Sequence, residues 1–258
     1  MKAPKRSVLA AVLACAALCG TACGRAPGRP SGLRLYAFVD RSASIRPGQQ
    51  SQWERDSQRL TRAIGPGWGV TVFAVHDQTL SAGPLFTAEI PPRSGDEGVD
   101  ELRRLKAAVR AARAGASQAF TKAFREPGKS SATDLFGAVD RILPDSEGRP
   151  TVAVFFSDMI HSTDEFDMER GPLPGDGDAA LFKTLAVRHF WRPETLRGVR
   201  VYCLLNSRGS GERGPHRLVL KRFYQRLFAA LGADLALFDT HVNSWNVMHT
   251  KGAGNAGN

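Results

Sequence analysis

Short, almost continuously apolar runs alternate along the chain with longer segments in which apolar residues recur at helical spacing. The runs rich in Val and Phe predict strands at residues 33–39, 69–76, 151–156, 199–205 and 233–238. The helical spacing predicts helices at 50–64, 99–124, 133–143 and 215–231, and residues 79–90 suit a hairpin or an edge strand. Apolar strands covered on both faces and separated by helices indicate an α/β fold with a doubly wound, mostly parallel sheet flanked by helices.

The first residues form a different kind of segment. Lys2, Lys5 and Arg6 precede an apolar stretch at 8–18, and small residues then lead to Cys23. This order of charge, apolar core and small residues is typical of a secretory signal peptide, which we place at residues 1–22. The apolar stretch is too short to span a bilayer as a helix.

The end of this leader resembles a bacterial lipobox, which implies that Cys23 is lipidated and becomes the mature N-terminus. Gly20 stands where such motifs usually have Leu, and Cys15 is a second candidate. Ordinary cleavage or an uncleaved anchor remain the alternatives. Two or more acyl chains suffice for stable attachment. We therefore expect an extracytoplasmic lipoprotein anchored to the bacterial cell membrane or the outer membrane.

The rest of the chain divides simply. Residues 23–32 are rich in Gly, Pro and Arg and predict a flexible tether that follows the lipidated cysteine. Residues 33–240 suit a single domain, and 241–258 form a C-terminal tail whose Gly- and Asn-rich end we expect to be disordered. Of the 4 cysteines only Cys203 lies in the body, within a predicted strand, so it is expected in the core and no internal disulfide is expected.

The charge of the chain is basic. The formal net charge is +10, and removal of the three leader cations leaves 10 − 3 = +7. Such a charge favours an anionic membrane surface, a cell-envelope polymer or an acidic partner. The cations are spread along predicted helices, as at Arg103, Lys106 and Arg110, which is typical of a solvated face. No nucleic-acid-binding motif is present, and we expect no nucleic acid as a partner.

Oxygen-bearing side chains gather where predicted strands end or helices begin. Asp40, Ser42 and Ser44 follow the first strand, Thr133 starts a helix, and Asp158 follows the strand at 151–156. The carboxyl ends of parallel strands meet at one edge of a sheet, and ligands bind there. Carboxylate and hydroxyl oxygens are ligands for hard cations. The sequence thus predicts a site for Mg²⁺, or for Mn²⁺ or Ca²⁺.

These residues resemble a known motif. Asp40-x-Ser42-x-Ser44, then Thr133-Asp134, then Ser157-Asp158 resemble in order the metal-ion-dependent adhesion site (MIDAS) of von Willebrand factor A (VWA) domains. The resemblance implies that Asp40, Ser42, Ser44, Thr133 and Asp158 hold the ion directly or through water.

The same resemblance implies that the bound ion captures an Asp or Glu of a protein partner, since the protein supplies only two carboxylates to the ion. The chain departs from the motif after Asp158, where Met159 replaces the usual glycine. We expect this methionine to narrow or reshape the rim of the site. The sequence favours a protein-interaction module over an enzyme, and the partner and the oligomeric state stay open.

Two alternatives remain. An extracytoplasmic Mg²⁺-dependent phosphohydrolase could use Asp40 as nucleophile, although Ser42 stands where such enzymes place a second aspartate. A metal-free VWA-like scaffold is the other alternative.

Two further segments carry no separate site. Gly128-Lys129-Ser130 lacks the earlier glycine of a phosphate loop and is interpreted as an ordinary connection. We interpret the acidic segment 161–178 as a solvated insertion rather than a second cation site. A role as the rim of the partner site is more plausible for it than metal binding.

Overall fold

The computed structural model describes residues 32–42, 50–126, 132–164, 166–170, 179–205 and 214–240. The predicted signal peptide, the lipidation site Cys23, the alternative Cys15, the tether up to residue 31, the C-terminal tail and the candidate ligand Ser44 lie outside these residues. Within the described part of the chain, no helix combines the length and the apolar character needed to cross a membrane.

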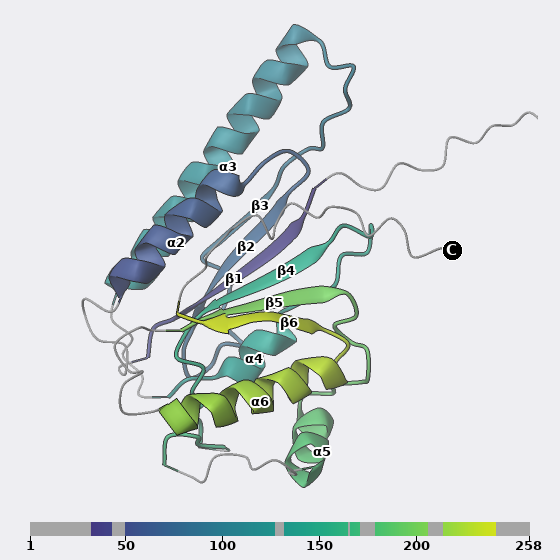
Figure 1. Ribbon diagram of the computed structural model, residues 1–258. Helices are drawn as coiled ribbons and strands as arrows, with labels where there is room; N and C mark the ends of the chain where they lie inside the picture. Colours follow the sequence, from purple (N-terminus) through teal and green to yellow (C-terminus); the bar gives the residue numbers. More distant parts are fainter. Residues whose placement is uncertain are drawn as a thin grey trace, which may run out of the picture.

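The core of the structure is a 6-stranded sheet in the order β3-β2-β1-β4-β5-β6 (Figure 1). All neighbouring strands are parallel except β2 and β3, which are antiparallel. This confirms the doubly wound, mostly parallel sheet that the apolar runs predict. The strands are β1 (Arg34–Asp40), β2 (Gly69–Val75), β3 (Phe86–Glu89), β4 (Thr151–Phe156), β5 (Val199–Leu204) and β6 (Asp234–Asp239).

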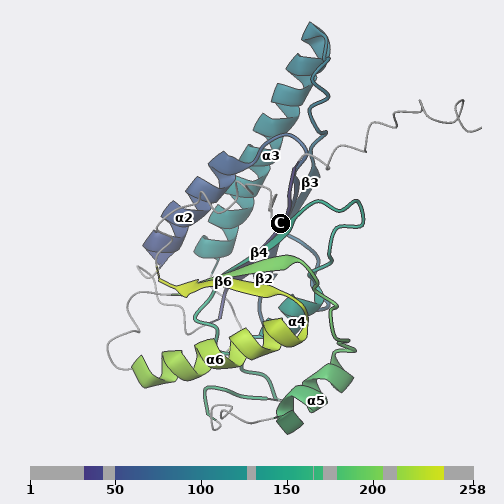
Figure 2. The same cartoon turned by 45° about the vertical axis from the view of Figure 1, so that its right-hand side comes forward.

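Helices cover both faces of this sheet. Figures 1 and 2 show α2 and α3 on one face and α4, α5 and α6 on the other. The helices are α2 (Gln50–Ala63), α3 (Val99–Arg125), α4 (Leu135–Asp140), α5 (Ala179–Arg188) and α6 (Gly214–Ala230). Because successive side chains of a strand point to opposite faces, β1 contributes Ala37 and Val39 to the core under α2 and α3, and Phe38 to the core on the other side.

Aromatic residues fill both cores. On the α4–α6 side, the ring of Phe38 stacks against Phe73 and Phe155, with centroids 5.5 and 4.7 Å apart. On the α2–α3 side, the ring of Phe156 meets Trp53 and Phe120 edge to face. The two central strands β1 and β4 are therefore fixed on both sides, and so are the positions at which the chain leaves their carboxyl ends.

Two elements differ from the sequence prediction. The helix expected at 133–143 is shorter, because the backbone of Thr133 pairs with Ser162 and the side chain of Asp134 accepts a hydrogen bond from the Gly137 N–H, so that α4 starts only at Leu135. The helix α5 has no counterpart among the predicted elements, because it is only 10 residues long and follows directly on the acidic segment 161–178.

Candidate metal site at the switch point of the sheet

The strand order reverses between β1 and β4. In an open α/β sheet, ligands bind outside the carboxyl ends of the strands at this switch point. Asp40 is the last residue of β1, and Asp158 comes two residues after the end of β4. Val39 and Phe156 are register partners, so the chain leaves both strands at the same level of the sheet. The two candidate carboxylates thus start from adjacent positions.

Asp40 is held in a fixed orientation. Its side chain is buried, with Oδ1 accepting a hydrogen bond from the Ser42 N–H at 2.8 Å and Oδ2 accepting one from the Ser157 hydroxyl at 2.6 Å. Burial raises the pKa of this carboxyl above its ordinary value, and the hydrogen bonds from Ser157 and Ser42 act in the opposite direction. A carboxylate has about four lone-pair positions, so these two bonds leave lone pairs for a cation.

The loop after β4 turns sharply around Asp158. The Asp158 Oδ1 accepts the Ile160 N–H at 3.0 Å, and the Ser157 hydroxyl oxygen accepts the Met159 N–H at 2.9 Å. Met159 has φ of 63°, the left-handed region that favours glycine. Its side chain is fully buried in the core with Met168. The expectation that Met159 reshapes the rim is therefore wrong, because the chain adopts the turn and directs the methionine inward.

Thr133 is fixed by backbone bonds from two other loops. Its N–H donates to the Ser162 carbonyl at 2.7 Å, and its carbonyl accepts the Ser162 N–H at 3.0 Å. The next residue, Asp134, donates its N–H to the carbonyl of His76, directly after β2. The Thr133 side chain is buried. Thr133 therefore lies between the loops that follow β2 and β4, at the same edge of the sheet as Asp40 and Asp158.

Two observations test whether a cation suits this edge. Among the described residues, no Lys, Arg or His side chain forms an ion pair with the buried Asp40, and its neighbour Arg41 pairs with Glu126 instead. A buried carboxylate without a cation is costly, and a metal ion would offset that cost. The donor set of carboxylates and hydroxyls suits a hard cation. The residues therefore fit the group that the motif implies.

The second observation lies on α6. Tyr224 is fully buried, and its hydroxyl has no hydrogen-bond partner among the residues that the structure describes. Burial raises the pKa of Tyr224 well above its ordinary value, with further contributions from Cys203, Asp158 and Asp40. A buried hydroxyl without a partner is uncommon, and the electrostatic contributions from Asp158 and Asp40 indicate that it lies on the same side of the sheet as the two candidate ligands.

Other cation sites are not supported within the described ranges. Among those residues, no group of three or more His, Cys, Asp or Glu side chains could together hold a metal ion. The candidate site at the switch point is of a different kind, because it has only two carboxylates and its other oxygens come from hydroxyls. Of the predicted ligands, Asp40, Ser42, Thr133 and Asp158 lie at one edge of the sheet, and Ser44 lies outside the described residues.

Sequence reasoning missed the positioning role of Ser157 and the buried hydroxyl of Tyr224. The adjacency of β1 and β4 was the only signal for Ser157, which stands opposite Asp40 once the register is known. Tyr224 had no signal, because a tyrosine within an apolar helix face is typical of any core. The described part of the acidic segment is also more buried than expected, since His161 and Met168 lie in the interior.

Comparisons with known proteins give a limited result. No family model matches the chain, and no curated protein matches it. Among solved structures, the fold is similar to a von Willebrand factor type A protein from Catenulispora acidiphila, with 13% sequence identity and a TM-score of 0.39. The match covers 81% of this chain and 39% of that chain, so this chain spans well under half of its length. A similarity this distant carries no information about function.

Together, the fold and the site define a class of protein: a doubly wound α/β domain with an oxygen-rich, buried carboxylate centre at its switch point.

Proposed function

We propose that this protein is a membrane-anchored, extracytoplasmic interaction module that binds a divalent cation at a MIDAS-like site and uses it to capture a partner's carboxylate. Asp40, Ser42, Thr133 and Asp158, with Ser44, would hold the ion. The observation that supports this most directly is the geometry of Asp40, a buried carboxylate at the switch point that is oriented by Ser42 and Ser157 and lacks an ionic partner among the described residues.

The chemistry of the donor set explains why an interaction module is the best fit. A divalent cation held by two carboxylates and neutral hydroxyls keeps little net negative charge around it, so it attracts a further carboxylate from outside. The protein's own residues supply the fixed half of that arrangement: Ser157 and Ser42 hold Asp40, and the turn at Met159 holds Asp158.

The phosphohydrolase alternative receives less support from this geometry. A nucleophilic Asp40 would need an open oxygen and a nearby general acid. Both of its oxygens instead accept hydrogen bonds, and the position two residues later is Ser42, whose backbone N–H makes one of these bonds. Assay of the protein with a generic phosphate ester separates the two functions, since only the enzyme would release phosphate in a manner that depends on Asp40.

Thermal unfolding tests the metal site. The midpoint of thermal unfolding of the full chain is measured first in the presence of chelator and then in the presence of Mg²⁺, Mn²⁺ or Ca²⁺. At one hundred times the dissociation constant, an ion that binds only the folded state adds about 2.7 kcal/mol. For a domain of this size the midpoint should then rise by about 5–10 °C. No rise with any of these ions at millimolar concentration would exclude the metal site and leave a metal-free scaffold.

The matched variants are Asp40→Asn and Asp100→Asn. Asp40→Asn keeps the side-chain volume and removes the charge, and we expect it to abolish the rise. Asp100 is an exposed carboxylate at the start of α3, and its variant should respond to the ion like the wild type. An equal response of all three proteins would show that the ion binds elsewhere.

The anchor is a separate part of the proposal and rests on the leader sequence alone. Detergent phase partition of the full chain, expressed in a bacterium, compares the wild type with Cys23→Ala and Cys15→Ala. We expect only Cys23→Ala to move the protein from the detergent phase to the aqueous phase. Retention of Cys23→Ala in the detergent phase together with loss of Cys15→Ala would identify Cys15 as the processed cysteine.

A further inference from the structure

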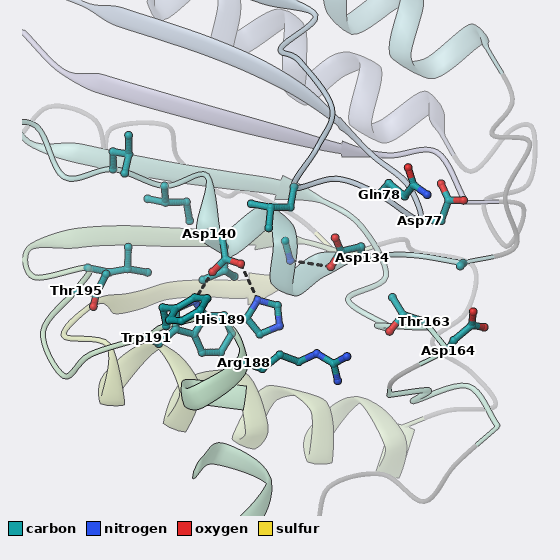
Figure 3. Close-up of a pocket in the computed structure, with 18 residues that line it drawn as sticks. Asp77, Gln78, Asp134, Asp140, Thr163, Asp164, Arg188, His189, Trp191 and Thr195 are labelled. Atoms are coloured by element: carbon teal, nitrogen blue, oxygen red, sulfur yellow. Dashed lines mark hydrogen bonds and ion pairs between the residues drawn. The ribbon is translucent and has the colours of Figure 1, made fainter. Parts of the chain in front are cut away.

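A pocket of about 880 Å³ opens on the face of the sheet covered by α4, α5 and α6 (Figure 3). Its walls come from segments far apart in the chain: the turn after β2, the start of α4 with the residues after its end, the loop after β4, and residues 188–196. A volume of this size is within the range that binds organic ligands or a few residues of a peptide. Of the candidate metal ligands that the structure describes, Asp40, Ser42, Thr133 and Asp158, none lines it.

The rim of the pocket is unusually apolar for a surface. Among the described residues, the large hydrophobic side chains that are exposed include Leu80 at 50%, Leu143 at 65% and Phe190 at 88%, and all three line this pocket. Scattered exposed hydrophobic residues are normal, whereas several gathered around a concave surface indicate an interaction site. Val99 is also exposed, at 69%, but it lies on α3, away from the pocket.

One wall of the pocket is built around Asp140. Its carboxylate accepts a hydrogen bond from His189 Nδ1–H at 2.6 Å and another from Trp191 Nε1–H. The two rings stack with centroids 4.7 Å apart, as Figure 3 shows beside Asp140. Since both neighbours of Phe190 point inward, Phe190 itself takes a left-handed φ of 53° and projects into solvent. The backbone that carries the exposed phenyl ring is therefore anchored on both sides of Phe190.

The charge of the lining is opposite to that of the whole chain. The acidic residues of the lining are Asp77, Asp134, Asp140 and Asp164. Among the described residues that line the pocket, Arg188 is the only Lys or Arg. With His189 counted as neutral, the local formal charge is 1 − 4 = −3. The whole chain carries +10. A concave site with acidic groups and an apolar rim is complementary to a cationic group that is carried next to apolar surface.

We propose that this pocket docks a segment of a protein partner in which an arginine or lysine lies next to a large apolar residue. The apolar side chain packs against the rim of Leu80, Leu143 and Phe190, and the cation lies over the acidic lining. His189 and Trp191 also line the pocket, and their stacked rings add aromatic surface that a guanidinium can contact. This docking surface is distinct from the carboxylate capture proposed above and does not depend on a metal ion.

The pocket lies next to the candidate metal site. Ala132 and Asp134 line the pocket and flank Thr133, one of the candidate metal ligands. Thr163 and Asp164 also line it, and they follow Ser162, whose backbone pairs with Thr133. A partner could thus present an acidic residue to the metal site and a basic, apolar segment to the pocket at the same time.

The test uses the full chain, in chelator, and short capped peptides. The probe is acetyl-Leu-Arg-Leu-Arg-amide, compared with acetyl-Leu-Glu-Leu-Glu-amide and acetyl-Gly-Arg-Gly-Arg-amide. Binding is followed by calorimetry and by the indole N–H resonance of Trp191, assigned with Trp191→Phe. We expect the first peptide to bind in the micromolar range and shift this resonance, and the other two to bind at least tenfold more weakly.

Three variants locate the binding. Phe190→Ala should weaken the first peptide about tenfold, and Asp164→Asn should weaken it severalfold and reduce its salt dependence. Val99→Ala removes an exposed apolar side chain outside the pocket and should leave binding unchanged. Asp164 is exposed, so its variant is expected to fold normally.

Several results would overturn the proposal. They are the absence of binding at millimolar peptide, equal binding of the acidic peptide, equal affinity for free arginine amide, or binding that Phe190→Ala and Asp164→Asn leave intact. Because the measurement is made in chelator, these outcomes are independent of whether the metal site exists.

Discussion

We predict that the stability of this protein depends on pH through the buried side chain of His161. Its ring is buried, with Nδ1 accepting the Leu135 N–H at 3.2 Å and Nε2 within 3.1 Å of the Thr163 hydroxyl. It also stacks on Phe136 with centroids 4.0 Å apart. A proton on Nδ1 would break the bond from Leu135 and place a charge in the interior. Burial, and secondarily the charge of His189, therefore lower the pKa of His161 from 6.5 to about 3.

The magnitude follows from the two pKa values. Below about pH 6.5 the unfolded chain binds a proton at His161, while the folded chain does not do so until about pH 3. The unfolded state thus binds more protons in this window, and folding stability falls as the pH falls. Each pH unit costs about 1.4 kcal/mol. The loss is about 2 kcal/mol at pH 5 and approaches about 5 kcal/mol near pH 3.

Urea unfolding at pH 7, 6 and 5 measures this dependence, in a range where ordinary carboxylates have not yet titrated. The matched variant is His161→Asn, because the amide oxygen can accept the Leu135 N–H but the side chain does not titrate. We expect the wild type to lose about 2 kcal/mol more than the variant between pH 7 and pH 5. Equal losses would refute the assignment of a buried, neutral His161, and so would an imidazole resonance of this residue that titrates near pH 6.5.

Three further predictions concern single side chains. Ser157→Ala removes the hydroxyl that donates to Asp40, and should cost about 1–3 kcal/mol in urea unfolding and also weaken the response to Mg²⁺; an unchanged Mg²⁺ response would contradict its role in orienting Asp40. Phe156→Ala, in the core under α2 and α3, should cost about 3–5 kcal/mol, and a loss below 1 kcal/mol would contradict the packing seen there. Gly115→Ala would place a methyl group against the ring of Phe86 and should lower the melting midpoint, whereas a rise would show that helix propensity outweighs the collision.

The sheet could be predicted from the sequence because its strands are apolar on both faces. The runs at β1, β4 and β5 are almost continuously apolar, a pattern that suits neither an amphipathic helix nor a loop. Their predicted bounds agree with the structure to within a residue. The ends of these strands placed Asp40 and Asp158 at one edge, since parallel strands of a doubly wound sheet leave that edge together.

The finer features could not be predicted from the sequence, because they depend on tertiary packing. The role of Ser157 depends on the register between β1 and β4, which links residues more than a hundred positions apart. The conformation of Met159 depends on backbone hydrogen bonds and on a buried space that only the assembled core provides. The pocket is lined from separate loops, and no single stretch of sequence contains its pattern. Such features arise from tertiary packing rather than from local spacing.

The strand order also divides the molecule along the chain. The strands β3, β2 and β1 all come from residues 34–89, and the strands β4, β5 and β6 all come from residues 151–239. Among the strands of the described residues, only the β1–β4 ladder joins the two sets. Each core nevertheless mixes side chains from both sets. A chain divided after Glu126 would yield two fragments, each with apolar surface that only the other can cover. These fragments should reassemble when mixed, and the reassembly would bring Asp40 and Asp158 together, so that the site forms only from the reunited halves.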